Sequence, residues 1–533
     1  MAVELAIREH FLFAIVGMCL LWSVAWLLGG VALRYAKTVR SLPIDQGMLR
    51  VVLGMNLLAW LGVVAGMSGA LATDRTVWCV GGLGLAAAWE CWLKRRELVR
   101  VPMVIGLLSR HPLLVALLTG AGLLTLGPAL AYPTGWDELV YHNVLPRRWR
   151  ADGWPAFYPD LPYSGFPSAC EILLWLIAPL ESVLAPRLFI WSCWIVGLTL
   201  MGRMIRRRVD GLTTVALVLA FAVSPTTLMA SANCYVESFL LMNVAALMFV
   251  LGTKYQTGLT GRSQETSEFQ RASPLLLGVL AGGSAAVKLT GLSVILLPLL
   301  WYAGGLCGKR TRARQSFRSA VVYLTVAACV CAPFYLRPWW ITGNPCYPYL
   351  ADWFNSSSAV QEMSRFHHDI GGMTYGMRGP VALPAGLVLL AFDARLYDGS
   401  YGWQFLVFVG LSLMAIGKMT GRRSVRSVAG WPALVFTVLY LFWFATAQQA
   451  RFALPAVMVM VLLASIGARR TKNQEPSRLC AGRGWWRDCY WLQRWSAFRG
   501  ELRGTTSVRG RQFSGSGRGP NTSKMGRTTT TFL

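Results

Sequence analysis

The stretch LLLGVLAGGSAAVKLTGLSVILLPLLWYA, residues 275–303, carries a single charged side chain, Lys288. The run is too long for one ordinary membrane crossing, since a helix needs roughly 20 apolar residues to traverse the hydrocarbon core. Gly282, Gly283 and Gly291 lie on either side of the lysine. Interrupted helices are tolerated in a membrane where they line a polar cavity. We therefore expect two short helices with a break between them.

The rest of the chain shares this apolar character. Of its 533 residues, 55% are hydrophobic and 14% are charged, which lies outside the usual range for a soluble domain. A lipid-exposed backbone must satisfy its own hydrogen bonds, and the alternating pattern of barrel strands is absent. The sequence predicts an all-α polytopic membrane protein with about 11–13 transmembrane helices. The clearest candidate spans are 11–32, 50–70, 76–93, 112–131, 187–202, 212–231, 235–252, 317–336, 403–417, 431–446 and 451–467.

The loops rich in Lys and Arg set the expected orientation, because such loops stay on the cytoplasmic side. Two long loops, 132–165 and 337–380, then fall on the extracytoplasmic face. This topology requires 275–303 to be a hairpin, and it requires 166–186 and 381–395 to be re-entrant or interfacial.

The net charge of +27 does not indicate nucleic-acid binding. The positive charges are spread over many loops, where membrane orientation and contact with anionic membrane lipids explain them. The chain has 12 cysteines but no CxxC pair and no metal-finger spacing. We expect one catalytic membrane domain, 1–468, with 11–32 as a retained span, and then a basic cytoplasmic tail, 469–533. The tail is rich in Arg, Gly, Ser and Thr, a composition typical of disorder.

The segment GWDELVYHNVLPRRW, residues 135–149, is the most polar part of the first long loop. Asp137 and Glu138 follow a membrane exit, Tyr141 lies one helical turn after Asp137, and His142 is its neighbour. A carboxylate at the edge of a low-dielectric region can act as a general base if it stays ionised. A helix cap or a pair of solvated acids is the alternative.

A second acid, Glu237, lies in NCYVESFLLMN, residues 233–243, and Glu171 lies in another apolar run. Ionisable groups within spans are costly and generally face a cavity. Glu237 is therefore a candidate functional residue, with helix capping or helix packing as the alternative.

Two isolated cations complete the set. A buried ammonium at Lys288 needs an anion or a cavity, and a helix break would offer backbone N–H groups to a phosphate. Arg451, in TAQQARFALPAV (446–457), has a guanidinium that can hold a phosphate with two hydrogen bonds. Snorkelling to the interface is the alternative for Lys288, and interfacial anchoring is the alternative for Arg451.

Together these residues indicate transfer from a phosphate-linked donor. A carboxylate base removes the acceptor's proton, and cations stabilise the charge that develops on the departing phosphate.

The ordered set of segments resembles the GT-C class of integral-membrane glycosyltransferases, which includes protein O-mannosyltransferases and lipid A aminoarabinose transferases. It is most similar to bacterial members with a first-loop DxxxYH. The resemblance spans roughly residues 110–467. The matching stretches are Asp137, Tyr141 and His142, Pro167 with Glu171, Tyr235 to Glu237 (where relatives often have Asp), Lys288 to Thr290, Gly343 to Leu350, and Gln449 to Pro455.

The resemblance implies transfer of a sugar, with inversion, from a polyprenyl-phosphate-linked donor to a lipid, glycan or protein acceptor. It implies a protein of the bacterial inner (cytoplasmic) membrane with its active site on the extracytoplasmic face. The expected roles are catalysis for Asp137, as general base, and Glu138, donor-phosphate binding for Lys288 and Arg451, and orientation of the acceptor or loop for Tyr141, His142 and Glu237.

A divalent metal is left open, because some members of the class use one and many do not; Asp137, His142, His367 and His368 are its candidate ligands. Two other function classes also remain open. A polytopic secondary transporter would share the broken helix and the intramembrane lysine. A lipid-linked glycan polymerase or ligase would share the donor chemistry, but it would keep its key arginines in one large late loop.

Overall fold

The structure is a computed structural model. It describes residues 2–35, 43–69, 82, 112–260, 265–306, 310–354, 356–367, 375–418 and 423–469. The predicted span 76–93, apart from residue 82, and the predicted tail beyond residue 469 lie outside these residues. The part of the chain that is described contains helices and no strand.

The helices follow one another along the chain, with π or 3-10 segments marked η. They are α1 (Ala2–Tyr35), α2 (Pro43–Met67), α6 (Pro112–Ala129), η1 (Glu138–His142), α7 (Val144–Asp152), η2 (Pro162–Gly165), α8 (Ala169–Ile177), η3 (Ala178–Leu180), α9 (Ala185–Arg206), α10 (Gly211–Ala222), α11 (Pro225–Ala232), α12 (Glu237–Thr260), α13 (Glu265–Val287), η4 (Leu289–Ile295), α14 (Leu296–Leu306), α15 (Arg310–Thr342), α16 (Ser358–His367), α17 (Ala382–Phe392), α18 (Ala394–Tyr397), α19 (Gln404–Gly417), α20 (Arg423–Ala445), η6 (Ala450–Ala453) and α21 (Leu454–Gly467).

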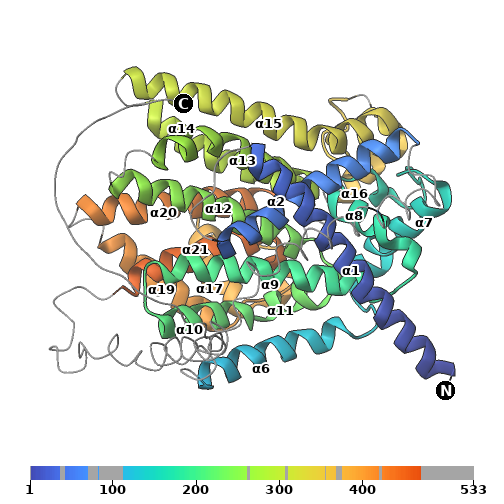
Figure 1. Ribbon diagram of the computed structural model, residues 1–533, viewed down its shortest axis with the longest axis horizontal. Helices are drawn as coiled ribbons and strands as arrows, with labels where there is room; N and C mark the ends of the chain where they lie inside the picture. Colours follow the sequence, from blue (N-terminus) through green and yellow to red (C-terminus); the bar gives the residue numbers. More distant parts are fainter. Residues whose placement is uncertain are drawn as a thin grey trace, which may run out of the picture. The chain divides into compact units, whose positions relative to one another are not determined.

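The helices confirm the predicted fold class, an all-α polytopic membrane protein. Among the described residues, five helices are long and apolar enough to cross a membrane, or six if the bent pair α10 and α11 forms one span. Several shorter apolar helices, including most of α12, α19 and α20, pack beside them. Helices α12 and α21 form the centre of the bundle; α9 and α13 pack on α12, and α19 and α20 on α21 (Figure 1).

The predicted break in the apolar run 275–303 is confirmed. Helix α13 ends at Val287, Lys288 has an extended backbone, and the chain continues as the 3-10 segment η4. At Gly291 the chain passes close to the backbone carbonyl of Ser284, and a Cβ atom there would clash with it. A glycine is needed for this close approach, so the sequence around the lysine encodes the break.

The predicted continuous span 212–231 is wrong in one respect. The chain forms two helices, α10 and α11, which meet at an angle of 71°. Pro225 starts the second helix. Proline has no N–H to donate to the preceding turn and disfavours helical geometry at the residue before it, so α10 ends shortly before it.

Segments 166–186 and 381–395 contain only short helices, and their re-entrant or interfacial placement stays a prediction. Their main helices, α8 and α17, have 9 and 11 residues, too short for a full crossing.

The two long loops lie together. Figure 1 shows α7, from the first loop, and α16, from the second, at the same end of the bundle. The Tyr347 side chain is buried against Phe157, with ring centroids 5.7 Å apart, and it also contacts Phe166. The described parts of two segments nearly 200 positions apart in the sequence therefore share one apolar cluster.

Candidate active site

Two ion pairs, one buried and one partly buried, bring four of the predicted residues together. Asp137 and Arg451 form one pair, with Oδ2 and Nη1 2.7 Å apart. Glu237 and Lys288 form the other, with Oε1 and Nζ 2.6 Å apart. The Lys288 side chain is 19% exposed, the most accessible of the four, and the Glu237 side chain is 2% exposed.

The ring of Phe452 joins the two pairs. The Nζ of Lys288 lies 3.6 Å from the ring centroid, and the Cζ of Arg451 lies 5.1 Å from it. Arg451 also lies 4.8 Å from the ring centroid of Tyr235. Cations are attracted to the negative faces of aromatic rings, so these rings help to hold both charges in place. We call Asp137, Glu237, Lys288, Arg451 and Phe452 the charge cluster.

Each charged member of the cluster lies where a regular α-helix begins or is interrupted. Asp137 precedes the π-helical turn η1, and Glu237 is the first residue of α12. Lys288 occupies the break before η4, and Arg451 lies in η6, directly before α21. The carboxylate of Glu237 also benefits from the positive end of the α12 dipole.

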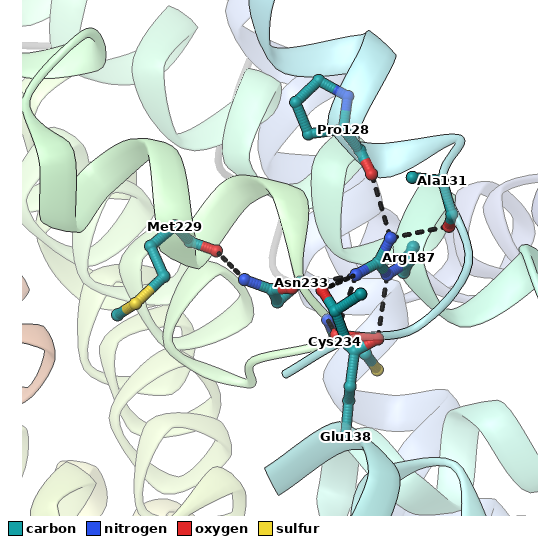
Figure 2. A network of polar contacts seen from close by, with 8 residues as sticks. Pro128, Ala131, Glu138, Arg187, Met229, Asn233 and Cys234 are labelled. Carbon is teal, nitrogen blue, oxygen red and sulfur yellow. Dashed lines mark hydrogen bonds and ion pairs between the residues drawn. The ribbon is translucent and has the colours of Figure 1, made fainter. Parts of the chain in front are cut away.

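Glu138 belongs to a separate network, shown in Figure 2. Its carboxylate has no exposed surface and accepts hydrogen bonds from Nε of Arg187, at 2.9 Å, and from the backbone N–H of Cys234, at 3.1 Å. Arg187 also donates to the carbonyl oxygens of Pro128 and Ala131, at 2.9 and 2.6 Å. It reaches the Asn233 side chain at 2.9 Å.

This network fixes the flanks of the charge cluster. Arg187 ties the end of α6 and the first loop to the bend before α12, so it sets the positions of both Asp137 and Glu237. Sequence reasoning missed Arg187, although a charged residue at the start of an apolar span was a usable signal. The sequence predicted that Glu138 takes part in catalysis with Asp137. Its carboxylate oxygens are fully buried and already accept hydrogen bonds from Arg187 and Cys234, which favours a role in positioning the loop instead.

Tyr141 and His142 lie close together, next to the cluster. Nδ1 of His142 lies 2.5 Å from Oε1 of Glu171, and Oε2 of Glu171 is buried without a partner. The Tyr141 ring stacks on Tyr163, with centroids 4.7 Å apart. Burial raises the pKa of Tyr141 well above 10, and the nearby Asp137 carboxylate raises it further. The phenol therefore stays protonated and can act as a hydrogen-bond donor.

A second residue that sequence reasoning missed is Arg337, near the end of α15. Its guanidinium is fully buried and donates to the carbonyl oxygens of Pro155 and Phe166, at 3.2 and 2.8 Å. It also approaches the Ser168 hydroxyl at 3.3 Å. Arg337 therefore connects the start of the second loop to the first. It lies one position beyond the predicted span 317–336, as the first residue of the predicted loop 337–380, and it belongs to no distinguishing motif.

The candidate metal ligands are not assembled into a site among the residues that the structure describes. No group of three or more His, Cys, Asp or Glu side chains there is arranged to hold a metal ion. Asp137 pairs with Arg451, and His142 pairs with Glu171. His367 ends α16. His368 lies outside the described residues.

A narrow cleft adjoins the charge cluster on the side of Phe452. It is bounded by α12, η4, α20 and α21. Most of its wall is apolar, and a few hydroxyl groups lie along it. The lining residues include Leu240, Thr290, Ser293, Leu439, Trp443 and Phe452.

Comparison with known proteins gives limited matches. Residues 244–458 match a family model described as "Domain of unknown function (DUF8201)". This match covers less than half of the chain and includes Lys288 and Arg451, but neither Asp137 nor Glu237. No curated protein matches the sequence.

Among solved structures, the chain is similar to the crystal structure of ArnT from Cupriavidus metallidurans bound to undecaprenyl phosphate. The identity is 14% and the TM-score is 0.45; the match covers 75% of this chain and 66% of that one. A likeness of this degree carries no conclusion about the activity of the present chain.

Proposed function

We propose that this protein is a membrane glycosyltransferase that moves a sugar from a polyprenyl-phosphate donor to a hydroxyl acceptor at the outer face of the membrane. The observation that carries the proposal is the charge cluster. Two carboxylates and two cations, from four distant segments, meet around one aromatic ring in a chain with very few charges in its spans. A structural role alone gives no reason to collect so many buried charges, because each is costly to desolvate.

The chemistry assigned to the cluster is a single displacement. Asp137 removes the proton from the acceptor hydroxyl as its oxygen attacks the anomeric carbon. A bond forms between that carbon and the acceptor oxygen, while the bond from the same carbon to the phosphate oxygen breaks. The electron pair of the broken bond leaves with the polyprenyl phosphate. Attack opposite the leaving group inverts the anomeric configuration.

Lys288 and Arg451 are assigned to the departing phosphate. The leaving group gains negative charge as the bond breaks, and cations fixed in a poorly hydrated site stabilise that charge. An ammonium has three N–H donors, and Lys288 uses one of them on Glu237. Its partial exposure leaves the other donors available to a ligand.

The cleft beside Phe452 is assigned to the polyprenyl chain. In this structure the cleft is narrow, with a volume of about 10 Å³, so α20 and α21 would have to separate for a prenyl chain to enter. A prenyl chain is wholly apolar, so it would bind there by burial of hydrocarbon surface, with its phosphate at the two cations.

Sugar transfer in reconstituted vesicles tests the proposal. A panel of radiolabelled polyprenyl-phosphate sugars is supplied with a membrane extract as the acceptor source. The wild type should transfer label, and Asp137→Asn should lose at least about a hundredfold in rate, the contribution of a general base. The matched control is Asp160→Asn, which removes an exposed carboxylate of the same loop, paired with Arg148. Full activity in Asp137→Asn would remove the assigned base.

The break at Lys288 also suits a secondary transporter, in which broken helices bind a substrate at mid-membrane. The same vesicles separate the two functions. A transporter would change the amount of labelled substrate inside the vesicles without forming a new glycosidic bond, whereas the proposed enzyme forms that bond.

A further inference from the structure

Each cation assigned to the donor phosphate is already in contact with a carboxylate of the protein. Asp137 forms an ion pair with Arg451, and Glu237 forms one with Lys288, with N–O distances of 2.7 and 2.6 Å. Both carboxylate side chains are less than one tenth exposed. Each of the two cations therefore already has a carboxylate of the protein as its partner.

The charges of this cluster balance. Two carboxylates and two cations give no net charge, and a bound phosphate would add at least one negative charge to a poorly hydrated site. A buried charge without a partner is strongly unfavourable. A phosphate can bind there favourably only if one carboxylate gives up its cation.

The two carboxylates differ in how firmly they are held. Glu237 lies at the start of the central helix α12, where the helix dipole favours its negative charge. Asp137 has helical backbone angles but stands directly before the π-helical turn η1, a less regular element than the start of α12. Asp137 is the carboxylate that can be displaced at lower cost.

We propose that the donor phosphate displaces Asp137 from Arg451, and that this exchange releases the carboxylate to act as the general base. This inference rests on the proposed function and adds that donor binding switches on the general base. Before the donor binds, Arg451 neutralises Asp137 and holds it away from an acceptor. After the donor binds, Arg451 pairs with the phosphate and the freed carboxylate faces the acceptor. The donor must then bind before the acceptor hydroxyl is activated.

The exchange makes an unusual prediction for the inactive variant. Asp137→Asn removes the anion that competes with the phosphate, so it should bind polyprenyl phosphate more tightly than the wild type. We expect a dissociation constant lower by about tenfold, on the scale of one partly buried ion pair. Asp137→Glu keeps the competing charge and should stay near the wild-type value.

Equilibrium binding to protein in lipid nanodiscs tests this, with polyprenyl phosphate, uncharged polyprenol and inorganic phosphate as separate probes. Tighter binding in Asp137→Asn should occur with polyprenyl phosphate and not with polyprenol. If Asp137→Asn also binds inorganic phosphate more tightly, and as tightly as it binds polyprenyl phosphate, the exchange stands but the site is one for free phosphate. The control is Glu181→Gln, which removes an exposed carboxylate from its pair with Arg150 and should leave all the constants unchanged.

The inference and the proposed function fail in different ways. Unchanged or weaker binding of polyprenyl phosphate by Asp137→Asn overturns the exchange, even if sugar transfer is lost. Tighter binding with normal sugar transfer keeps the exchange and overturns the role of Asp137 as base. If Asp137→Asn is too unstable for binding studies, polyprenyl phosphate should raise its melting temperature more than that of the wild type. An equal rise in both proteins overturns the exchange.

Discussion

Lys288 and Phe452 are in direct contact, with the ammonium nitrogen 3.6 Å from the centroid of the ring. The lysine comes from a break between two helices and the phenylalanine from the short segment before α21. The same ring lies against the Arg451 guanidinium. Phe452 therefore sets the spacing of the two cations to which we assign the donor phosphate.

Replacing Phe452 by Leu should weaken donor binding. Leucine keeps an apolar side chain of comparable size but offers no aromatic face, and a cation–π contact contributes about 0.5–2 kcal/mol. We expect the KM for the polyprenyl-phosphate donor to rise about three- to tenfold, with a smaller change in kcat. Steady-state kinetics over a range of donor concentrations measure this, and Phe392→Leu, at an exposed position, is the control. An unchanged donor KM would show that the ring does not hold the cations.

Breaking the Glu138–Arg187 pair should destabilise the protein. Glu138→Gln or Arg187→Met leaves the partner charge buried and unpaired, which costs about 3–5 kcal/mol. Unfolding in detergent micelles measures the loss. The double variant removes both charges, so we expect it to lose less stability than the sum of the two single variants. Strictly additive losses would mean that the two side chains do not act as a pair.

Arg337→Met should loosen the contact between the two long loops. It removes the hydrogen bonds to the Pro155 and Phe166 carbonyl oxygens and leaves those oxygens buried without that donor. Limited proteolysis in micelles should cut residues 153–168 or 343–367 faster than in the wild type. Arg148→Met is the comparison, because its pair with Asp160 is exposed and contributes about 1 kcal/mol or less. Equal cleavage rates in the Arg337 and Arg148 variants would contradict the role of Arg337.

The phenol of Tyr141 should resist ionisation. Its pKa is raised by burial and by Asp137, so the folded protein keeps this proton above about pH 10, where an unfolded chain releases it. The folded state then binds more protons than the unfolded state, and the stabilisation present below pH 10 is lost as the pH rises further. The ultraviolet spectra of wild type and Tyr141→Phe should titrate alike near pH 10 when folded and differ when unfolded. A tyrosinate signal from Tyr141 near pH 10 in the folded protein would contradict its burial.

Much of the fold follows from sequence because it depends on local composition. Apolar runs become helices wherever lipid replaces water, since no other partner exists for the backbone groups. The break at Lys288 is equally local, because it depends on nearby glycines and one charge. Pro225 was a local signal for the bend between α10 and α11, but the long apolar run around it led to the prediction of one continuous span.

The candidate site is only partly local. The sequence identified Asp137, Glu237, Lys288 and Arg451 one by one, because charges are rare in apolar segments. It assigned the two cations to a ligand, whereas the structure pairs each with a carboxylate. It gave no role to Arg187, Arg337 or Phe452, whose partners lie tens to hundreds of positions away.

The sequence by itself therefore determined the membrane class, the break at Lys288 and the identity of the four charges. Hydropathy, glycine content and the rarity of charged residues act over short stretches of chain and can be read there. Only the tertiary structure decided which acid meets which cation and which ring lies between them. Those pairings depend on how distant helices pack, because a buried charge is stabilised by the neighbours that folding brings to it.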